Sequence, residues 1–209
     1  MTWTTWLAFF AAAWAISISP GAGAVAAMSA GLSHGFRKGY FTTVGLILGI
    51  WTQALIVALG LGALIATSPL AYQVVKWAGV AYLVYLGVQQ WRAEPKPFSA
   101  TQEGGGVPAR SLILRGWGVN AINPKGTVFM LAVVPQFLDL AQPLVPQYLV
   151  VVATLTFTDA VVMGGYTALA ARVLKELQSV EHLRLLNRVF GTLFIVAGLL
   201  LASVNQAAH

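Results

Sequence analysis

The sequence predicts an all-α membrane protein of six transmembrane helices, arranged as a 3+3 inverted repeat. Three observations lead to this fold class: a strongly apolar composition, six long apolar stretches, and a proline motif inside two of those stretches. The 209 residues are expected to form a single transmembrane domain. Its first repeat is expected over about 1–91, a cytoplasmic loop over about 92–111, and its second repeat over about 112–209.

The composition indicates which solvent surrounds the protein. Apolar residues make up 58% of the chain and charged residues 9%, whereas a soluble domain has about 25% charged residues. So few charges cannot cover a water-exposed surface, which excludes a soluble enzyme, a nucleic-acid-binding domain and a disordered chain. The chain has no cysteine and only three widely spaced histidines. The sequence therefore predicts no metal site, no cofactor and no catalytic nucleophile.

Six stretches are long enough to cross a bilayer, which requires about 20 mostly apolar residues. Polar or helix-breaking segments separate them, among them a six-residue loop at 34–39. The stretch 172–190 alternates charged and apolar residues, and two interpretations stay open for it: an amphipathic helix on the inner leaflet, or a solvated loop. The expected spans are 4–31, 41–66, 71–91, 112–137, 146–171 and 186–204.

The orientation follows from lysine and arginine, which concentrate in cytoplasmic loops. Ten of them fall in the loops after the first, third and fifth spans or within a few residues of these loops, only Lys76 falls on the opposite side, and Lys125 lies deep inside a span. Both termini are therefore expected outside and the three basic loops inside. The ten are Arg37, Lys38, Arg92, Lys96, Arg110, Arg115, Arg172, Lys175, Arg184 and Arg188.

Two tripeptides predict helix interruptions within the membrane. The first span contains Ser19-Pro20-Gly21 and the fourth contains Asn123-Pro124-Lys125. Proline removes a backbone donor and clashes with the preceding turn, and serine and asparagine are favoured N-caps. Each tripeptide is therefore expected to begin a new helix inside the bilayer. An ordinary proline kink is the alternative.

The position of the two tripeptides predicts a site for an anionic group. Three spans per half invert the second half relative to the first, so the two internal helix starts would face each other. Each start carries unpaired N–H groups and partial positive charge. A substrate carboxylate is expected between the amides of 21–23 and 125–127. The expected substrate-binding residues are Ser19, Pro20, Gly21, Gly23, Asn120, Asn123, Pro124, Lys125 and Tyr166.

Asp159 is the one acidic residue near the middle of a span. It lies about 13 residues, or roughly 20 Å, from the start of the fifth span. An ionised carboxylate at that depth costs about 3 kcal/mol or more and usually marks a transport pathway. Asp159 is therefore expected to couple substrate movement to protons, and to meet the substrate ammonium together with Asn120 or Tyr166. The alternative is a static pair with Lys125 that only holds two helices together.

These residues together resemble the LysE-type family of bacterial amino-acid exporters, over nearly the whole chain. Ala22 stands where many members have a second proline after Pro-Gly, which resembles the branch that exports homoserine. The resemblance implies an inner-membrane exporter that is driven by the proton gradient and forms a homodimer. The matching segments are Ser19-Pro20-Gly21 with 34–37, the stretch 76–92, Asn123-Pro124-Lys125 with 135–137, Asp159 with 165–166, and 187–188 with Gly191 and Gly198.

The expected function is secondary active export of small neutral amino acids and their derivatives: homoserine, homoserine lactone or threonine. Proton antiport through Asp159 would drive it, so the expected partners are the amino acid, the proton, the lipid bilayer and a second copy of the chain. Two alternatives stay open at this point. One is a channel for amino acids or other small solutes, and the other is an exporter of a different amino acid such as leucine.

Overall fold

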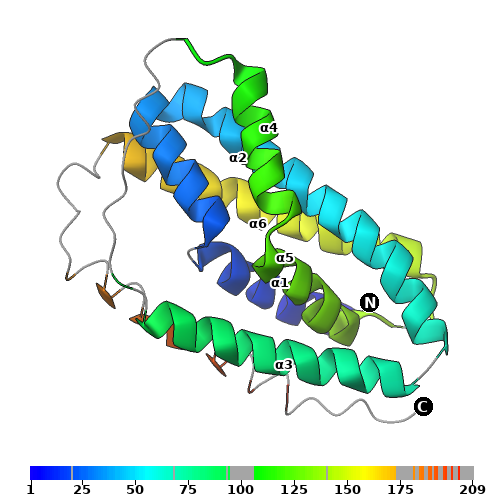
Figure 1. Cartoon of the computed structure of the whole chain (residues 1–209). Helices are drawn as coiled ribbons and strands as arrows, with labels where there is room; N and C mark the ends of the chain where they lie inside the picture. Colours follow the sequence, from blue (N-terminus) through cyan, green and yellow to red (C-terminus); the bar gives the residue numbers. More distant parts are fainter. Residues whose placement is uncertain are drawn as a thin grey trace.

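The computed structural model describes residues 1–19, 21–67, 69–92, 94, 106–139 and 141–172, with scattered residues from 181 to 202. Every regular element in these ranges is helical, and no strand occurs in them, which confirms the all-α prediction (Figure 1). The α-helices are α1 (Trp3–Ile18), α2 (Ala22–Thr67), α3 (Pro69–Arg92), α4 (Ala109–Ala121), α5 (Pro124–Val128) and α6 (Leu144–Arg172). A π-helix, η1 (Phe129–Val133), and a 3-10 helix, η2 (Val134–Phe137), follow α5.

Two helical segments among the described residues are long and apolar enough to cross a membrane: Leu144–Arg172, and Ala22–Gly60 when it is counted across Gly35, where the backbone is not helical. The helix α1 is apolar but has only 16 residues. The count of six spans and the inverted repeat therefore stay predictions. Most of the loop 92–111, the alternating stretch 172–190 and the expected sixth span, 186–204, lies outside the described residues.

The structure corrects the expected loop at 34–39. Helix continues on both sides of Gly35, and the chain reverses at this one residue, whose φ is 71° and ψ 173°. Glycine reaches positive φ without steric cost, which explains why a single residue makes the turn. The two parts of α2, residues 22–34 and 36–67, are called its first and second arms below. Figure 1 shows them doubling back on each other.

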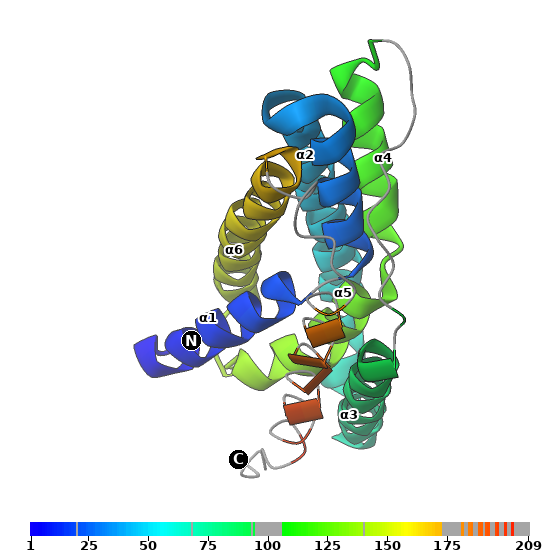
Figure 2. The same cartoon turned by 90° about the vertical axis from the view of Figure 1, so that its left-hand side faces the viewer.

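Close helix packing holds the centre of the bundle together. The helix α2 packs against α4 on one side and α6 on the other, while α3 lies at the edge against η1 (Figure 2). A Cβ atom built on Gly49 would lie 2.7 Å from the Asn120 Cβ, so no larger residue fits there. Gly45 likewise lies directly against the Ile113 carbonyl. Small residues let membrane helices approach this closely.

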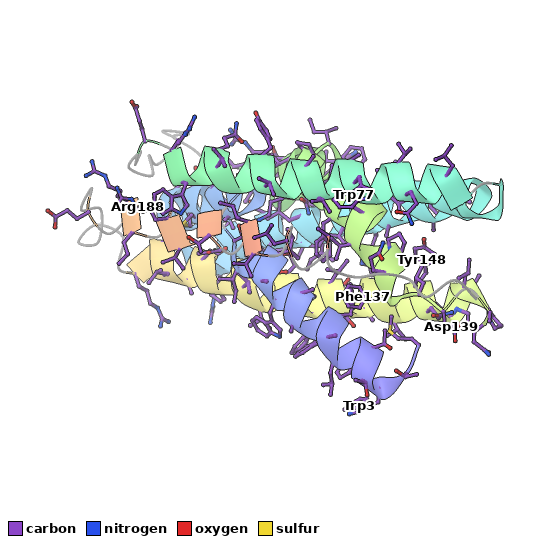
Figure 3. The ribbon with its side chains drawn as sticks, turned by 90° about the horizontal axis from the view of Figure 1, so that it is seen from below. Trp3, Trp77, Phe137, Asp139, Tyr148 and Arg188 are labelled. Atoms are coloured by element: carbon purple, nitrogen blue, oxygen red, sulfur yellow. The ribbon has the colours of Figure 1, made fainter. Side chains whose placement is uncertain are left out.

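The surface and the two ends of the bundle suit a membrane protein. Large apolar side chains are exposed along the described helices, for example Leu59 at 72% and Leu149 at 65%. Figure 3 places Arg188 and Asp139 at opposite ends of the bundle. The bend of α2 and the end of α6 share one end (Figure 1). This end carries basic residues that the sequence assigns to the cytoplasm.

Candidate functional site

The first interruption separates α1 from α2. Helix α1 ends at Ile18, and Ser19 has an extended backbone with φ −64° and ψ 121°. The first hydrogen bond into α2 runs from the Val25 N–H to the Gly21 carbonyl, at 3.0 Å. The cap position therefore falls on Gly21, not on Ser19 as the sequence led us to expect. The Ser19 hydroxyl is buried and has no hydrogen-bond partner among the described residues. Pro20 lies outside them.

The second interruption separates α4 from α5. Asn123 has an extended backbone, and its side-chain oxygen accepts a hydrogen bond from the Lys125 N–H at 3.1 Å. Pro124 is the first residue of α5. The side-chain amide of Asn123 donates to the Asn120 side chain at 3.1 Å, and Asn120 in turn donates to the Leu46 carbonyl at 2.8 Å. This chain of bonds fixes the new helix start against the second arm of α2.

A small cavity lies where the two interruptions meet, and we call it the central cavity. The volume that the centre of a water molecule can occupy in this cavity is about 60 Å³. Helices α1, α2, α4, α5 and α6 and the π-helix all contribute to its wall. It is lined by Ile16, Ser17, Ser19, Gly21, Gly23, Ala24, Ile50, Gln53, Asn120, Asn123, Lys125, Gly126, Phe129, Met130, Leu155, Asp159 and Met163.

Lys125 connects the two interruptions. Its ammonium donates to the Ser19 carbonyl at the end of α1. Its aliphatic chain covers Gly21, because a Cβ there would lie 3.3 Å from the Lys125 Cδ. The ammonium therefore satisfies a carbonyl that the end of α1 leaves without a helical partner. This position also puts a positive charge beside both helix starts.

Asp159 supplies the opposite charge from α6. Its side chain is only 9% exposed and lines the central cavity. Ser17 on α1 and Lys125 on α5 are the polar groups that act on it electrostatically. The Ser17 hydroxyl also lies 3.1 Å from the Thr158 hydroxyl. A buried carboxylate, an ammonium and the Ser17 hydroxyl therefore line one small space, within which a proton or a zwitterion can alter the charge balance.

Two of the expected substrate-binding residues are not among those lining the cavity. Pro124 begins α5 and is exposed. Tyr166 donates its hydroxyl to the Ile18 carbonyl, so it binds the last turn of α1. Tyr166 and Lys125 thus contact adjacent carbonyls at the same helix end. The other expected residues in the described ranges line the cavity.

Gln53, a polar side chain on the second arm of α2, also lines the central cavity. Its amide nitrogen donates to the Asn123 carbonyl at 2.8 Å and to the Thr127 hydroxyl at 2.9 Å. The Asn123 carbonyl can only accept, which fixes the amide orientation. The Gln53 side-chain oxygen is left buried, with no hydrogen-bond partner among the described residues.

Comparison with known proteins decides the family. The profile of the LysE type translocators matches residues 14–204, which is most of the chain. The protein belongs to the LysE-type translocator family. Within the described residues no group of three or more His, Asp or Glu could hold a metal ion. Membership of this family indicates a membrane transporter.

Several relatives align over nearly the full length of this LysE-type protein. The homoserine/homoserine lactone efflux protein of Salmonella typhimurium is 38% identical over 99% of this chain and 100% of its own. An uncharacterized membrane protein of Vibrio cholerae is 40% identical over 96% and 97%. The leucine efflux protein of an Enterobacter species is 28% identical over 91% of each chain. No solved structure matches.

Proposed function

We propose that this LysE-type protein exports small neutral amino acids, homoserine first among them, across the bacterial inner membrane by proton antiport. The central cavity carries the proposal, because it combines one buried acid and one buried amine with two helix starts. A zwitterionic amino acid presents the complementary pair of charges. The relatives named for homoserine, homoserine lactone and leucine efflux support the substrate class.

The carboxylate is proposed to bind on the side of Lys125. There the helix starts at 21–23 and 125–127 offer amide N–H groups and partial positive charge. The substrate carboxylate competes with the Ser19 carbonyl for the Lys125 ammonium. The volume that water centres can occupy, about 60 Å³, corresponds to about four to six water molecules. In the liquid these molecules would fill about 120–180 Å³. This size suits a small amino acid better than a large one. A lactone has no free carboxylate, so this half of the scheme favours homoserine over its lactone.

The ammonium is proposed to bind on the side of Asp159. In the inward-facing state the ionised carboxylate accepts the substrate ammonium. At the outer face a proton replaces the substrate on Asp159, and the amino acid leaves. With Asp159 protonated, the empty site holds no uncompensated buried carboxylate, whose charge would be unfavourable during the return. The protein then returns to the inward-facing state and releases the proton there. Rocking of one three-helix repeat against the other would expose the site alternately.

The proposed arrangement in the membrane follows the basic residues. Both termini are placed outside, the basic loops inside, and two copies of the chain form a homodimer. The chain has no cysteine, so single cysteines introduced at Thr2 and Lys38 give unique labels. Impermeant thiol reagents should label Thr2→Cys only from outside and Lys38→Cys only from inside. Labelling of both from the same side would refute the proposed orientation.

The transport assay that tests the proposal uses purified protein in liposomes. Vesicles preloaded with unlabelled homoserine should accumulate labelled homoserine transiently by counterflow, and an imposed proton gradient should drive net uphill movement. A channel would only dissipate the gradient. The same assay with threonine, leucine and lysine ranks the substrates. Failure to exchange any neutral amino acid would refute the proposed function. A preference for leucine would instead favour the alternative that the protein is a leucine exporter.

Gln53 is proposed to recognise the substrate hydroxyl, because its side-chain oxygen is an acceptor fixed in the cavity wall. We expect Gln53→Met, of similar shape, to reduce the preference for homoserine over 2-aminobutyrate by about tenfold, within the range that a buried hydrogen bond contributes. The measurement is the ratio of kcat/KM for the two substrates. Thr52→Ser, a conservative change one residue away on the same arm, is the control. An unchanged ratio in Gln53→Met would exclude this role.

A further inference from the structure

A second cavity lies between the first arm of α2, its second arm and α4. The space in it that is open to the centres of water molecules is about 360 Å³, against about 60 Å³ in the central cavity. Along the first arm it extends from His34 to Ala22, a distance of about 18 Å at 1.5 Å per residue. It is lined by Ala22, Val25, Ala26, Ser29, Ala30, His34, Thr42, Leu112, Arg115 and Val119.

The second cavity and the central cavity share two walls. Ala22 lines the second cavity, while its neighbours Gly21 and Gly23 line the central one. On α4, Val119 faces the second cavity and the next residue, Asn120, faces the central cavity. The start of α2 and the end of α4 therefore form a partition only one helix thick. A modest movement of the first arm would join the two spaces.

The polar groups of the second cavity suit a hydrated space that receives an anion. Arg115 projects from α4, and its guanidinium geometry matches a carboxylate. Thr42 is 2% exposed, and its hydroxyl has no hydrogen-bond partner among the described residues. A buried hydroxyl of this kind is unfavourable unless water or a solute binds it. No acidic residue occurs among the lining residues given above, so nothing in the described wall repels a carboxylate.

We propose that the second cavity is the inner vestibule of the transport pathway, where Arg115 captures the substrate carboxylate before the substrate reaches the central cavity. The inference rests on the proposed function, since an exporter loads from the cytoplasm. His34 and Arg115, which the sequence places at the cytoplasmic end, are among the residues that line the vestibule. Its volume exceeds that of a small amino acid, which fits a region of passage better than a closely fitted binding site.

Neutralising Arg115 tests the vestibule. In liposomes, Arg115→Gln should raise the KM for homoserine at the cytoplasmic face about fivefold or more and leave kcat within about twofold, as expected when a ground-state binding contact is removed. The KM for homoserine methyl ester, which has no carboxylate, should stay unchanged, and Arg115→Lys should recover much of the loss. Arg110→Gln, on the same helix and outside the lining residues, is the matched control.

A second measurement does not depend on Arg115. The cysteine-free chain allows Ala26→Cys in the vestibule wall and Leu114→Cys on the exposed face of α4 as the control. A negatively charged thiol reagent applied from the cytoplasmic side should inhibit Ala26→Cys, and homoserine should protect against it. Modification of Leu114→Cys should not inhibit transport.

Several results would refute the proposal that the second cavity is the inner vestibule. One is an equal KM change in Arg115→Gln and Arg110→Gln, or equal changes for homoserine and its ester. Another is normal transport by fully modified Ala26→Cys. An Arg115→Gln defect that follows the anionic lipid content of the vesicles would assign the cavity to lipid instead. A wild-type protein that moves no amino acid refutes the proposed function itself, whereas an active wild type with these results refutes only the vestibule.

Discussion

Replacing Asp159 by asparagine should abolish uphill export while leaving the protein folded. The amide keeps the shape and can still hydrogen-bond with Ser17, but it cannot release a proton. Without the titratable group the imposed proton gradient has no means of driving the substrate, so the accumulation ratio should fall to about one, the value for a carrier with no energetic bias between states. The measurement is homoserine accumulation in liposomes with and without a proton gradient, alongside counterflow.

The control for this prediction is Asp139→Asn. Asp139 lies between η2 and α6, where its carboxylate oxygen accepts from the Ala141 N–H at 3.0 Å, and the asparagine side-chain oxygen can do the same. This variant should export normally. If Asp159→Asn still concentrated homoserine at the normal proton coupling, Asp159 would be a structural partner of Lys125, and the coupling group would lie elsewhere.

Adding one methyl group at Gly116 should destabilise the bundle strongly. A Cβ there would overlap the Thr42 carbonyl and lie 3.1 Å from the Leu46 N–H nitrogen, both backbone atoms that cannot move alone. Overpacking of this kind costs about 1–3 kcal/mol. At about 2–4 °C per kcal/mol for a chain of this size, Gly116→Ala should lower the Tm in detergent by roughly 2–12 °C. Thermal unfolding followed by circular dichroism measures it.

Gly118→Ala is a matched control on the same helix. A Cβ at Gly118 has no atom within 4 Å, and alanine favours helix over glycine by about 1 kcal/mol. This variant should therefore be as stable as the wild type or slightly more so. Equal destabilisation by both substitutions would mean that α4 does not pack against the second arm of α2 as described.

The fold class follows from composition, but several backbone details do not. Few charges and long apolar stretches require helices in a bilayer, because only helices satisfy their own backbone hydrogen bonds there. The turn at Gly35 was not predictable as a one-residue reversal, since a polar loop and a tight turn have the same sequence pattern. The change from α5 to a π-helix and then a 3-10 helix depends on packing around Phe129–Phe137, which local propensity does not describe.

The charged residues of the candidate site and those of the two proline motifs could be anticipated, whereas the contacts of Gln53 and Ser17 could not. Asp159 and Lys125 each stand out as an ionisable residue inside an apolar span, and the structure brings both to the central cavity. The role of Gln53 depends on contacts with Asn123 and Thr127, about seventy residues away. Ser17 contributes only because α1 packs on α6. Such pairings follow from tertiary packing, for which one sequence carries no direct signal.

Because the chain reverses at Gly35, this single residue is the hinge between the first and second arms of α2. No other part of the described structure lies within 4 Å of the position that a Gly35 Cβ would occupy, so this side of the turn is open. From 34 to 22 the rigid arm measures about 18 Å, and turning it by about 10° sweeps its tip through about 3 Å, the diameter of a water molecule. In geometric terms, a change of one water diameter at the midplane therefore corresponds to a small rotation about the two backbone torsions of Gly35.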